Sequence, residues 1–177
     1  MAQPALPIDR IRPFAGIVLA IGAVVLGTAL ASQYWGGLAP CELCLLQRWP
    51  WDAAIAIAIV VLFVGREPAL PWVALLFALV FSVSAAFGLY HVGVEQHWWA
   101  GPTACTAGGG AATVEELRRQ ILGTQPVLCD QPAWTLFGIS LAGWNLLASL
   151  AVAAGCLAVF WRNRRPAGAP GLRRGAA

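Results

Sequence analysis

The chain has 177 residues, of which 59% are apolar and 11% charged, and it contains no lysine. A soluble domain usually has about 25% charged residues, so this composition excludes an ordinary soluble fold and indicates one integral membrane domain. The net charge of +3 comes from dispersed arginines that mostly flank apolar runs, which gives no reason to expect a nucleic-acid partner.

Four apolar segments follow one another along the chain, over about residues 14–32, 46–64, 69–90 and 136–161. The first would rise roughly 28 Å as a helix, about one hydrocarbon thickness. Each segment must be helical, because the bilayer core has no water to satisfy backbone groups. Since only residues 65–68 join the second segment to the third, we expect an all-α bundle of four transmembrane helices, with residues 1–177 as a single membrane domain.

The arginines are unevenly divided between the two sides of this arrangement. Positive residues favour cytoplasmic segments, so the richer side, and with it both termini and the tail 162–177, is predicted to be cytoplasmic. Loops 33–43 and 91–134 then face outward. A signal peptide cleaved near residues 29–31 is the alternative, although the apolar run is longer than a usual signal core. The richer side carries Arg10, Arg12, Arg66, Arg162, Arg164, Arg165, Arg173 and Arg174, and the other side carries Arg48, Arg118 and Arg119.

The long outer loop changes character along its length. Trp98 and Trp99 are typical of side chains that anchor at the lipid headgroups. A glycine run at 108–110 predicts flexibility close to Cys105. Residues 113–122 begin with a capping box and predict a short amphipathic helix, which either lies on the membrane surface or packs on the loop itself.

Two cysteine pairs lie at the ends of the apolar segments, Cys41 with Cys44 and Cys105 with Cys129. An oxidising outer compartment makes disulfides the natural state of both pairs. Cysteines three residues apart can close a small strained disulfide, and a helix that starts beside Cys44 favours its thiolate after reduction. This combination indicates electron exchange between thiols and an acceptor dissolved in the lipid.

Arg48 lies one helical turn after Cys44 and just inside a span, where a charge is costly and marks a candidate functional site. Its partner is Asp52, four residues on, or an oxyanion that develops on a bound acceptor, and both can hold. His91 ends the third span at the same depth, either as a polar residue that reaches the interface or as a ligand. Cys156 lies inside the fourth span and is interpreted as a small apolar core residue.

A zinc site is the main competing interpretation of the cysteines. Two pairs can bind tetrahedral zinc, but 23 residues separate Cys105 from Cys129, instead of a short spacing. Leu45 stands where a c-type haem motif requires histidine. We therefore predict no metal ligand.

Together these features resemble the disulfide bond formation protein B (DsbB) family. The resemblance covers about residues 14–161. It rests on CELCLLQRW at the start of the second span, YHVGVEQHWW at the end of the third, and the cysteine pair of the last outer loop. It implies a quinone-dependent protein-disulfide oxidoreductase of the bacterial inner membrane. Electrons would pass from a periplasmic thioredoxin-fold oxidase resembling DsbA to the loop pair, then to the helix pair, and then to ubiquinone or menaquinone.

The resemblance also implies roles for individual residues at the lipid side. Cys41 and Cys44 would form the disulfide that is coupled to the quinone, and Cys44 would be the thiolate beside the quinone ring. Arg48 would contact the quinone, and His91 falls where the family has a residue close to it.

On the protein side, the resemblance implies that the partner's thiolate attacks Cys105 and that Cys129 is its resolving mate, with residues 98–104 in the partner's peptide groove. A related branch of the family serves dedicated partners. Two other classes remain as alternatives. One is a vitamin K epoxide reductase-like enzyme, in which the cysteine pairs come in the opposite chain order. The other is a membrane scaffold with structural disulfides or zinc.

Overall fold

Four long helices make up most of the computed structural model, which describes residues 7–102, 113–115, 118 and 127–164. Each of the four is long and apolar enough to cross a membrane, which confirms the predicted all-α four-helix membrane fold. The elements are η1 (Pro7–Asp9), α1 (Ile11–Tyr34), α2 (Glu42–Val64), η2 (Glu67–Ala69), α3 (Leu70–Glu95), β1 (Thr135–Leu136), β2 (Ile139–Ser140) and α5 (Leu141–Asn163).

The predicted amphipathic helix over residues 113–122 lies largely outside the described residues. Within it, Val114, Glu115 and Arg118 are helical and exposed. The choice between a helix on the membrane surface and one packed on the loop therefore stays open.

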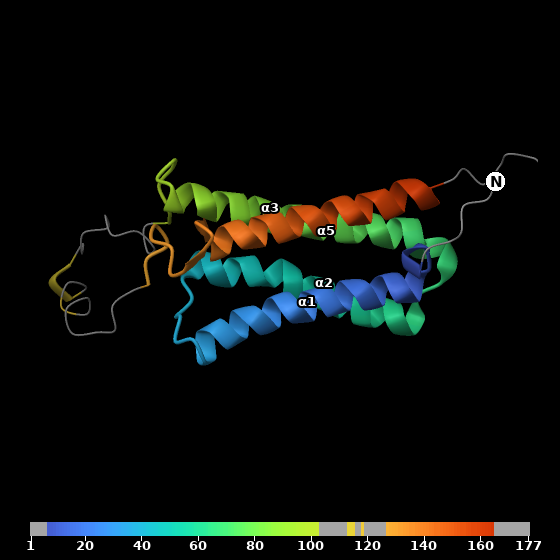
Figure 1. The fold of residues 1–177 in the computed structure, drawn as a ribbon, viewed down its shortest axis with the longest axis horizontal. Coiled ribbons are helices and arrows are strands. Elements are labelled where there is room, and N and C mark those ends of the chain that lie inside the picture. Colours follow the sequence, from blue (N-terminus) through green and yellow to red (C-terminus); the bar gives the residue numbers. More distant parts are fainter. Residues whose placement is uncertain (1–6, 103–112, 116–117, 119–126, 165–177) are drawn as a thin grey trace, which may run out of the picture.

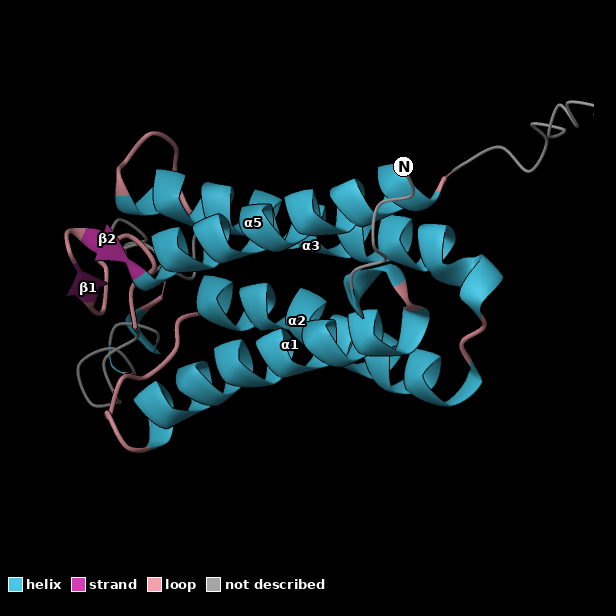
Figure 2. Ribbon diagram, turned by 45° about the vertical axis from the view of Figure 1, so that its right-hand side comes forward, coloured by secondary structure: helices cyan, strands magenta, loops and turns pink. Residues whose placement is uncertain are grey.

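The helices form an elongated antiparallel bundle (Figure 1). Helix α1 packs on α2 and α2 on α3, and the most extensive contact joins α3 to α5. The C-terminal ends of α1 and α3 therefore lie with the N-terminal ends of α2 and α5. We call this the cysteine end, because Cys41 and Cys44 lie there, and the opposite end the arginine end. The β1–β2 hairpin lies at the cysteine end, beside the start of α5 (Figure 2).

Aromatic rings fill the middle of the bundle. Trp51 and Phe81 pack edge to face with ring centroids 4.8 Å apart, and Phe14 and Phe77 do the same at 5.8 Å. All four side chains are fully buried. Close packing of this kind is a main source of stability for helices in lipid, since the lipid tails are themselves apolar.

Small residues let α3 and α5 approach each other closely. A Cβ atom added at Gly88 would lie 3.0 Å from Cα of Leu146. One turn away, the buried hydroxyl of Ser149 donates to Oγ of Ser84 at 2.8 Å. Close backbone approach and hydrogen bonds between helices are the contacts that hold helices together in a bilayer.

Helix α5 begins at Leu141, whereas the sequence predicts a span from residue 136. Residues 135–140 instead form an antiparallel hairpin, in which Phe137 and Gly138 have positive φ angles of 54° and 78°. Two such residues between paired strands match the twist of a tight hairpin. The apolar side chains of this turn extend the hydrophobic run in the sequence without continuing the helix.

Two other helices extend further toward the cysteine end than their apolar runs. Helix α2 begins at Glu42, with Cys41 as its N-cap, and not at residue 46. Helix α3 continues past Tyr90 to Glu95. The added turn of α3 carries His91 and Glu95, two polar side chains that are buried against protein, so hydropathy alone does not assign this turn to the span. As a result, His91 lies inside a helix and not at the start of a loop.

Polar contacts close the arginine end. Arg162 pairs with Asp9 at 2.6 Å, which ties the end of α5 to η1. The carboxylate of Glu67 accepts the backbone N–H of Ile11 at 3.0 Å, which ties η2 to the first turn of α1.

Candidate thiol redox site

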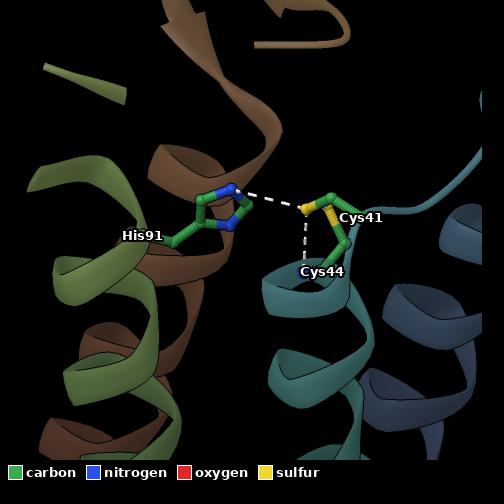
Figure 3. A group of neighbouring side chains, drawn as sticks. All are labelled: Cys41, Cys44 and His91. Atoms are coloured by element: carbon green, nitrogen blue, oxygen red, sulfur yellow. Dashed lines mark hydrogen bonds between the residues drawn. The ribbon is translucent and has the colours of Figure 1, made fainter. Parts of the chain in front are cut away.

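Cys41 and Cys44 lie at the N-terminus of α2 (Figure 3). Their sulfur atoms are 2.7 Å apart, and the backbone N–H of Cys44 donates to Sγ of Cys41 at 3.2 Å. Cys41 is buried and Cys44 is half-buried. The sequence predicts a disulfide here in an oxidising compartment. The structure places the two sulfurs side by side, as such a disulfide requires, and the disulfide itself stays a prediction.

Cys41 holds its proton firmly. Its hydrogen bond with Cys44 and its burial raise the pKa of the Cys41 thiol from 9.0 to about 12, while a hydrogen bond with His91 acts in the opposite direction. Only a thiolate is a good nucleophile. Cys41 therefore needs a neighbouring group that stabilises its ionised form whenever it takes part in exchange.

His91 extends from α3 toward this pair (Figure 3). Its Nε2 lies 3.6 Å from Sγ of Cys41 and 3.9 Å from Oε1 of Glu95. Only 3% of His91 is exposed, so the interpretation as a polar residue that reaches the interface is wrong. The structure instead makes His91 a buried neighbour of the thiol pair.

A chain of polar side chains continues from His91 into the bundle. Nε2 of Gln47 lies 2.5 Å from Nδ1 of His91, and Nδ2 of Asn145 donates to Oε1 of Gln47 at 2.6 Å. The indole N–H of Trp51 donates to Oδ1 of Asn145 at 2.8 Å. The motif-based prediction misses these residues. The sequence does hold a signal for them. Burying a polar amide inside an apolar span costs free energy, so such a residue is a candidate for a functional site.

Arg48 contacts Gln33 and not Asp52. Its Nη1 donates to Oε1 of Gln33 at 2.7 Å, which joins α2 to the last turns of α1. Asp52 is exposed on the surface of α2. The ion pair that the spacing of four residues allows is therefore not formed, and the Arg48 guanidinium is bound by Gln33 instead.

A cavity of about 340 Å³ opens at the cysteine end. Cys44, Arg48 and His91 lie together in its wall, with Gln47 and Asn145. The rest of the wall is mostly apolar and comes from α1, the segment before α2, and α5. An apolar cavity with a few convergent polar groups is typical of a small-molecule site.

Cys129 is brought to the same place by the segment that precedes β1. It is completely buried and belongs to one small cluster with Cys41 and Val94, against which Cys44 packs. The structure thus places Cys129, one member of the loop pair, close to Cys41 and Cys44, and the spacing in the sequence does not reveal this proximity. Cys105 lies outside the described residues, so its pairing with Cys129 stays a prediction.

The chain is similar to proteins of a known family. The family described as "Disulfide bond formation protein DsbB" matches residues 11–159. The chain belongs to the DsbB family. Disulfide bond formation protein B 2 of Pseudomonas savastanoi pv. phaseolicola is 33% identical, over 71% of this chain and 74% of that protein. Disulfide bond formation protein B of Albidiferax ferrireducens is 30% identical over 86% and 88%, and Disulfide bond formation protein B 1 of Pseudomonas putida is 30% identical over 90% and 96%. No solved structure gives a significant match.

Membership of the DsbB family identifies a disulfide bond formation protein with a disulfide oxidoreductase role. The four candidate spans make it a multi-pass membrane protein. The family favours this class over the two alternatives, a vitamin K epoxide reductase-like enzyme and a structural scaffold.

Three potential metal ligands also come together in this DsbB-family protein. The two sulfurs of Cys41 and Cys44 and a ring nitrogen of His91 lie within 4.8 Å of one another. The cysteine spacings do not predict this grouping, because His91 comes from a different helix. Two thiols and an imidazole suit a soft metal only if the imidazole nitrogen that faces them has a free lone pair.

Trp99, one of the two tryptophans that precede the loop cysteine, packs on α3. Trp99 stacks on Tyr90 with ring centroids 6.1 Å apart, and its indole N–H donates to the backbone oxygen of Tyr90 at 2.9 Å. Gly93 leaves the room for this ring, since a Cβ atom there would overlap it. The start of residues 98–104, the segment predicted for a partner's groove, is therefore anchored on the helix that carries His91.

Proposed function

We propose that this DsbB-family protein is a quinone-dependent thiol oxidase. It reoxidises a thioredoxin-fold partner resembling DsbA through Cys105 and Cys129. It passes the electrons through Cys41 and Cys44 to a membrane quinone, ubiquinone or menaquinone, and so sustains disulfide formation in exported proteins.

The cavity at the cysteine end is the single observation that supports this proposal best. It offers an apolar volume of about 340 Å³ next to the Cys44 thiol, at the end of four membrane-spanning helices. A lipid-soluble ring can enter such a site from the bilayer. Arg48 lies in the same wall, and a fixed guanidinium stabilises the negative charge that builds on a quinone oxygen during reduction.

The proposed electron path consists of thiol–disulfide exchanges followed by one quinone reduction. A thiolate of the partner attacks Cys105, and Cys129 leaves with the electron pair of the broken bond. Because Cys129 is buried in the same cluster as Cys41, exchange with the helix pair needs little movement of Cys129. The dithiol of Cys41 and Cys44 then gives two electrons and two protons to the quinone, which yields a quinol and closes their disulfide.

The proposed location is the bacterial inner membrane, with both termini in the cytoplasm. The cysteine end then faces the periplasm, where an exported partner is available. The arginines at the opposite end support this orientation through the preference of positive residues for the cytoplasm.

Turnover in lipid nanodiscs tests the proposed function. In the absence of oxygen, a reduced thioredoxin-fold partner should be oxidised only when a quinone is supplied. Cys44→Ser should abolish this reaction. Cys156→Ala is the matched control, because Cys156 is buried in the helix core. Full turnover in Cys44→Ser, or turnover without an acceptor, would contradict the proposal.

Thiol trapping identifies the partner. In Cys129→Ala cells, the mixed disulfide between Cys105 and the partner cannot be resolved, so a covalent complex should accumulate and be recognised by mass spectrometry. The matched Cys105→Ala variant should trap nothing. A single captured partner other than a general oxidase would place the protein in the branch with dedicated partners.

A further inference from the structure

We infer that Trp51, Asn145 and Gln47 are positioning residues that fix the tautomer of His91, so that its Nε2–H donates to the sulfur of Cys41. The effect on turnover rests on the proposed function. The tautomer itself does not, because it can be measured without quinone or partner.

Trp51 sets the direction of this chain of hydrogen bonds at its inner end. An indole N–H can only donate, so Asn145 must present its oxygen to Trp51, as it does at 2.8 Å. The amide nitrogen of Asn145 then donates to the oxygen of Gln47 at 2.6 Å. This leaves the amide nitrogen of Gln47 as a donor to Nδ1 of His91, 2.5 Å away. A neutral imidazole whose Nδ1 accepts a hydrogen bond carries its hydrogen on Nε2.

The groups that face Nε2 of His91 are consistent with the same assignment. Oε2 of Glu95 accepts the hydroxyl hydrogen of Ser140 at 2.5 Å, because Oγ of Ser140 itself accepts the backbone N–H of Gly143 at 3.1 Å. Oε1 of the Glu95 carboxylate therefore offers a lone pair to Nε2, 3.9 Å away. The sulfur of Cys41, at 3.6 Å, is the second acceptor. The hydrogen-bond chain therefore has a donor, the Trp51 indole, at one end and two acceptors, Glu95 and Cys41, at the other.

Burial of these side chains favours this one direction of the hydrogen bonds. Trp51, Gln47 and His91 are each less than 9% exposed, so solvent cannot replace a lost partner. A reversed Gln47 amide would place its nitrogen against the nitrogen of the half-buried Asn145, so that two donors face each other. Leaving such groups unsatisfied costs more free energy than an ordinary hydrogen bond contributes.

The consequence concerns the Cys41 thiolate. When the Cys129 thiolate attacks Cys41, a disulfide forms between them and Cys44 leaves as the thiolate beside the cavity. When Cys105 then attacks Cys129, the loop disulfide forms again and the electron pair of the broken bond stays on Cys41. The Nε2–H of His91 stabilises that thiolate, and it does so again when Cys41 ionises to close the disulfide. Because Nε2 carries hydrogen, it has no lone pair for a metal, so the same chain argues against metal binding by Cys41, Cys44 and His91.

Nitrogen NMR of the reduced full-length protein in nanodiscs, labelled with ¹⁵N-histidine, tests the inference. The chain has two histidines, so His97→Gln assigns the signals of His91. We expect the hydrogen on Nε2 of His91 in the unmodified protein. Trp51→Phe removes the indole donor but keeps a ring in the core, and should increase the share of the Nδ1–H form.

Asn145→Asp gives the sharpest arm, because it is isosteric and its carboxylate only accepts hydrogen bonds. Gln47 must then turn its amide nitrogen toward Asp and its oxygen toward His91, which moves the hydrogen to Nδ1. Alkylation of Cys41 at fixed pH should fall about tenfold, since the thiolate loses a donor. Asn163→Asp, at the arginine end, is the matched control and should change neither readout.

An Nδ1–H form in the unmodified protein would overturn the inference, and so would a tautomer unchanged in both Trp51→Phe and Asn145→Asp. If the tautomer and the alkylation rates behave as expected but quinone-dependent turnover is absent, the proposed function fails and the positioning role stands. If turnover is present but the tautomer does not move in either variant, the proposed function stands and the positioning role fails.

Discussion

The reactivity of the thiol pair depends on how Cys41 keeps its proton. Because the pKa of Cys41 is raised to about 12, its protonated form is favoured in the folded protein and contributes stability below pH 9.0. This contribution is lost as the pH rises toward 12. Alkylation of reduced Cys41 by a small reagent should therefore keep rising, by about tenfold per pH unit, up to pH 10, instead of levelling off near pH 9.

Mass spectrometry of the Cys41 peptide gives this profile, and Cys44→Ala provides its control. That variant removes the hydrogen bond that contributes most to the raised pKa. Its profile should level off at a lower pH than that of the unmodified protein. A Cys41 profile that already levels near pH 9 with Cys44 present would show that the hydrogen bond between the two thiols does not hold the proton.

Arg48 is a second residue whose chemistry gives a prediction. Its guanidinium is directed to Gln33 beside the cavity, so its charge is available to a reduced acceptor. Arg48→Leu should lower quinone-dependent kcat by at least about tenfold, and Arg48→Lys should restore part of it. Asp52→Asn should leave turnover unchanged, because Asp52 does not pair with Arg48. Equal losses in the Asp52 and Arg48 variants, measured by partner oxidation, would restore the ion-pair interpretation.

At the scale of the elements, α3 shows where prediction from sequence stops. Hydropathy locates this helix but ends it at residue 90, since His91 and Glu95 are polar. Their partners lie on other elements, Cys41 at the start of α2 and Ser140 at the end of β2. A polar turn becomes part of the helix because of these partners, and a pattern along one segment does not contain them.

The contact between α3 and α5 predicts different responses to the same substitution at two glycines. Gly88→Val should destabilise the protein by about 1–3 kcal/mol, because the added atoms meet the backbone of Leu146. Gly155→Val, in α5, is the matched control, since a Cβ atom there has no neighbour within 4 Å. Thermal unfolding in detergent measures the difference. Equal midpoints for the two variants would mean that the helices do not pack as closely as described.

At the scale of the whole molecule, the four spans and the position of the helix pair can be predicted from the sequence because each is a local pattern. The site around the pair cannot, because it is assembled across the bundle. Gln47 and Asn145 are 98 residues apart, and Trp51 and Asn145 are 94 residues apart. Only the rotation of each packed helix decides which side chains meet, and the apolar faces of these spans do not specify that rotation.

The proposed orientation follows from the charge of the whole molecule. Crossing the bilayer four times returns the chain to its starting side, so the termini share one side, and the described arginines of the arginine end lie there. Positive residues are retained in the cytoplasm. In a cysteine-free variant, Gln96→Cys at the cysteine end should react with a membrane-impermeant maleimide in cells with a permeable outer membrane. Pro68→Cys, at the arginine end, should react only after the inner membrane is opened.

The two labelling positions control each other, because both are exposed and close to helix ends. If only Pro68→Cys were labelled in intact cells, the orientation would be the reverse of the proposed one. It would also place the thiol pair in a reducing compartment, where a disulfide of this kind does not persist. The orientation and the thiol chemistry are therefore linked. The proposed oxidase needs its cysteine end in the oxidising compartment, and the arginines at the other end favour that orientation.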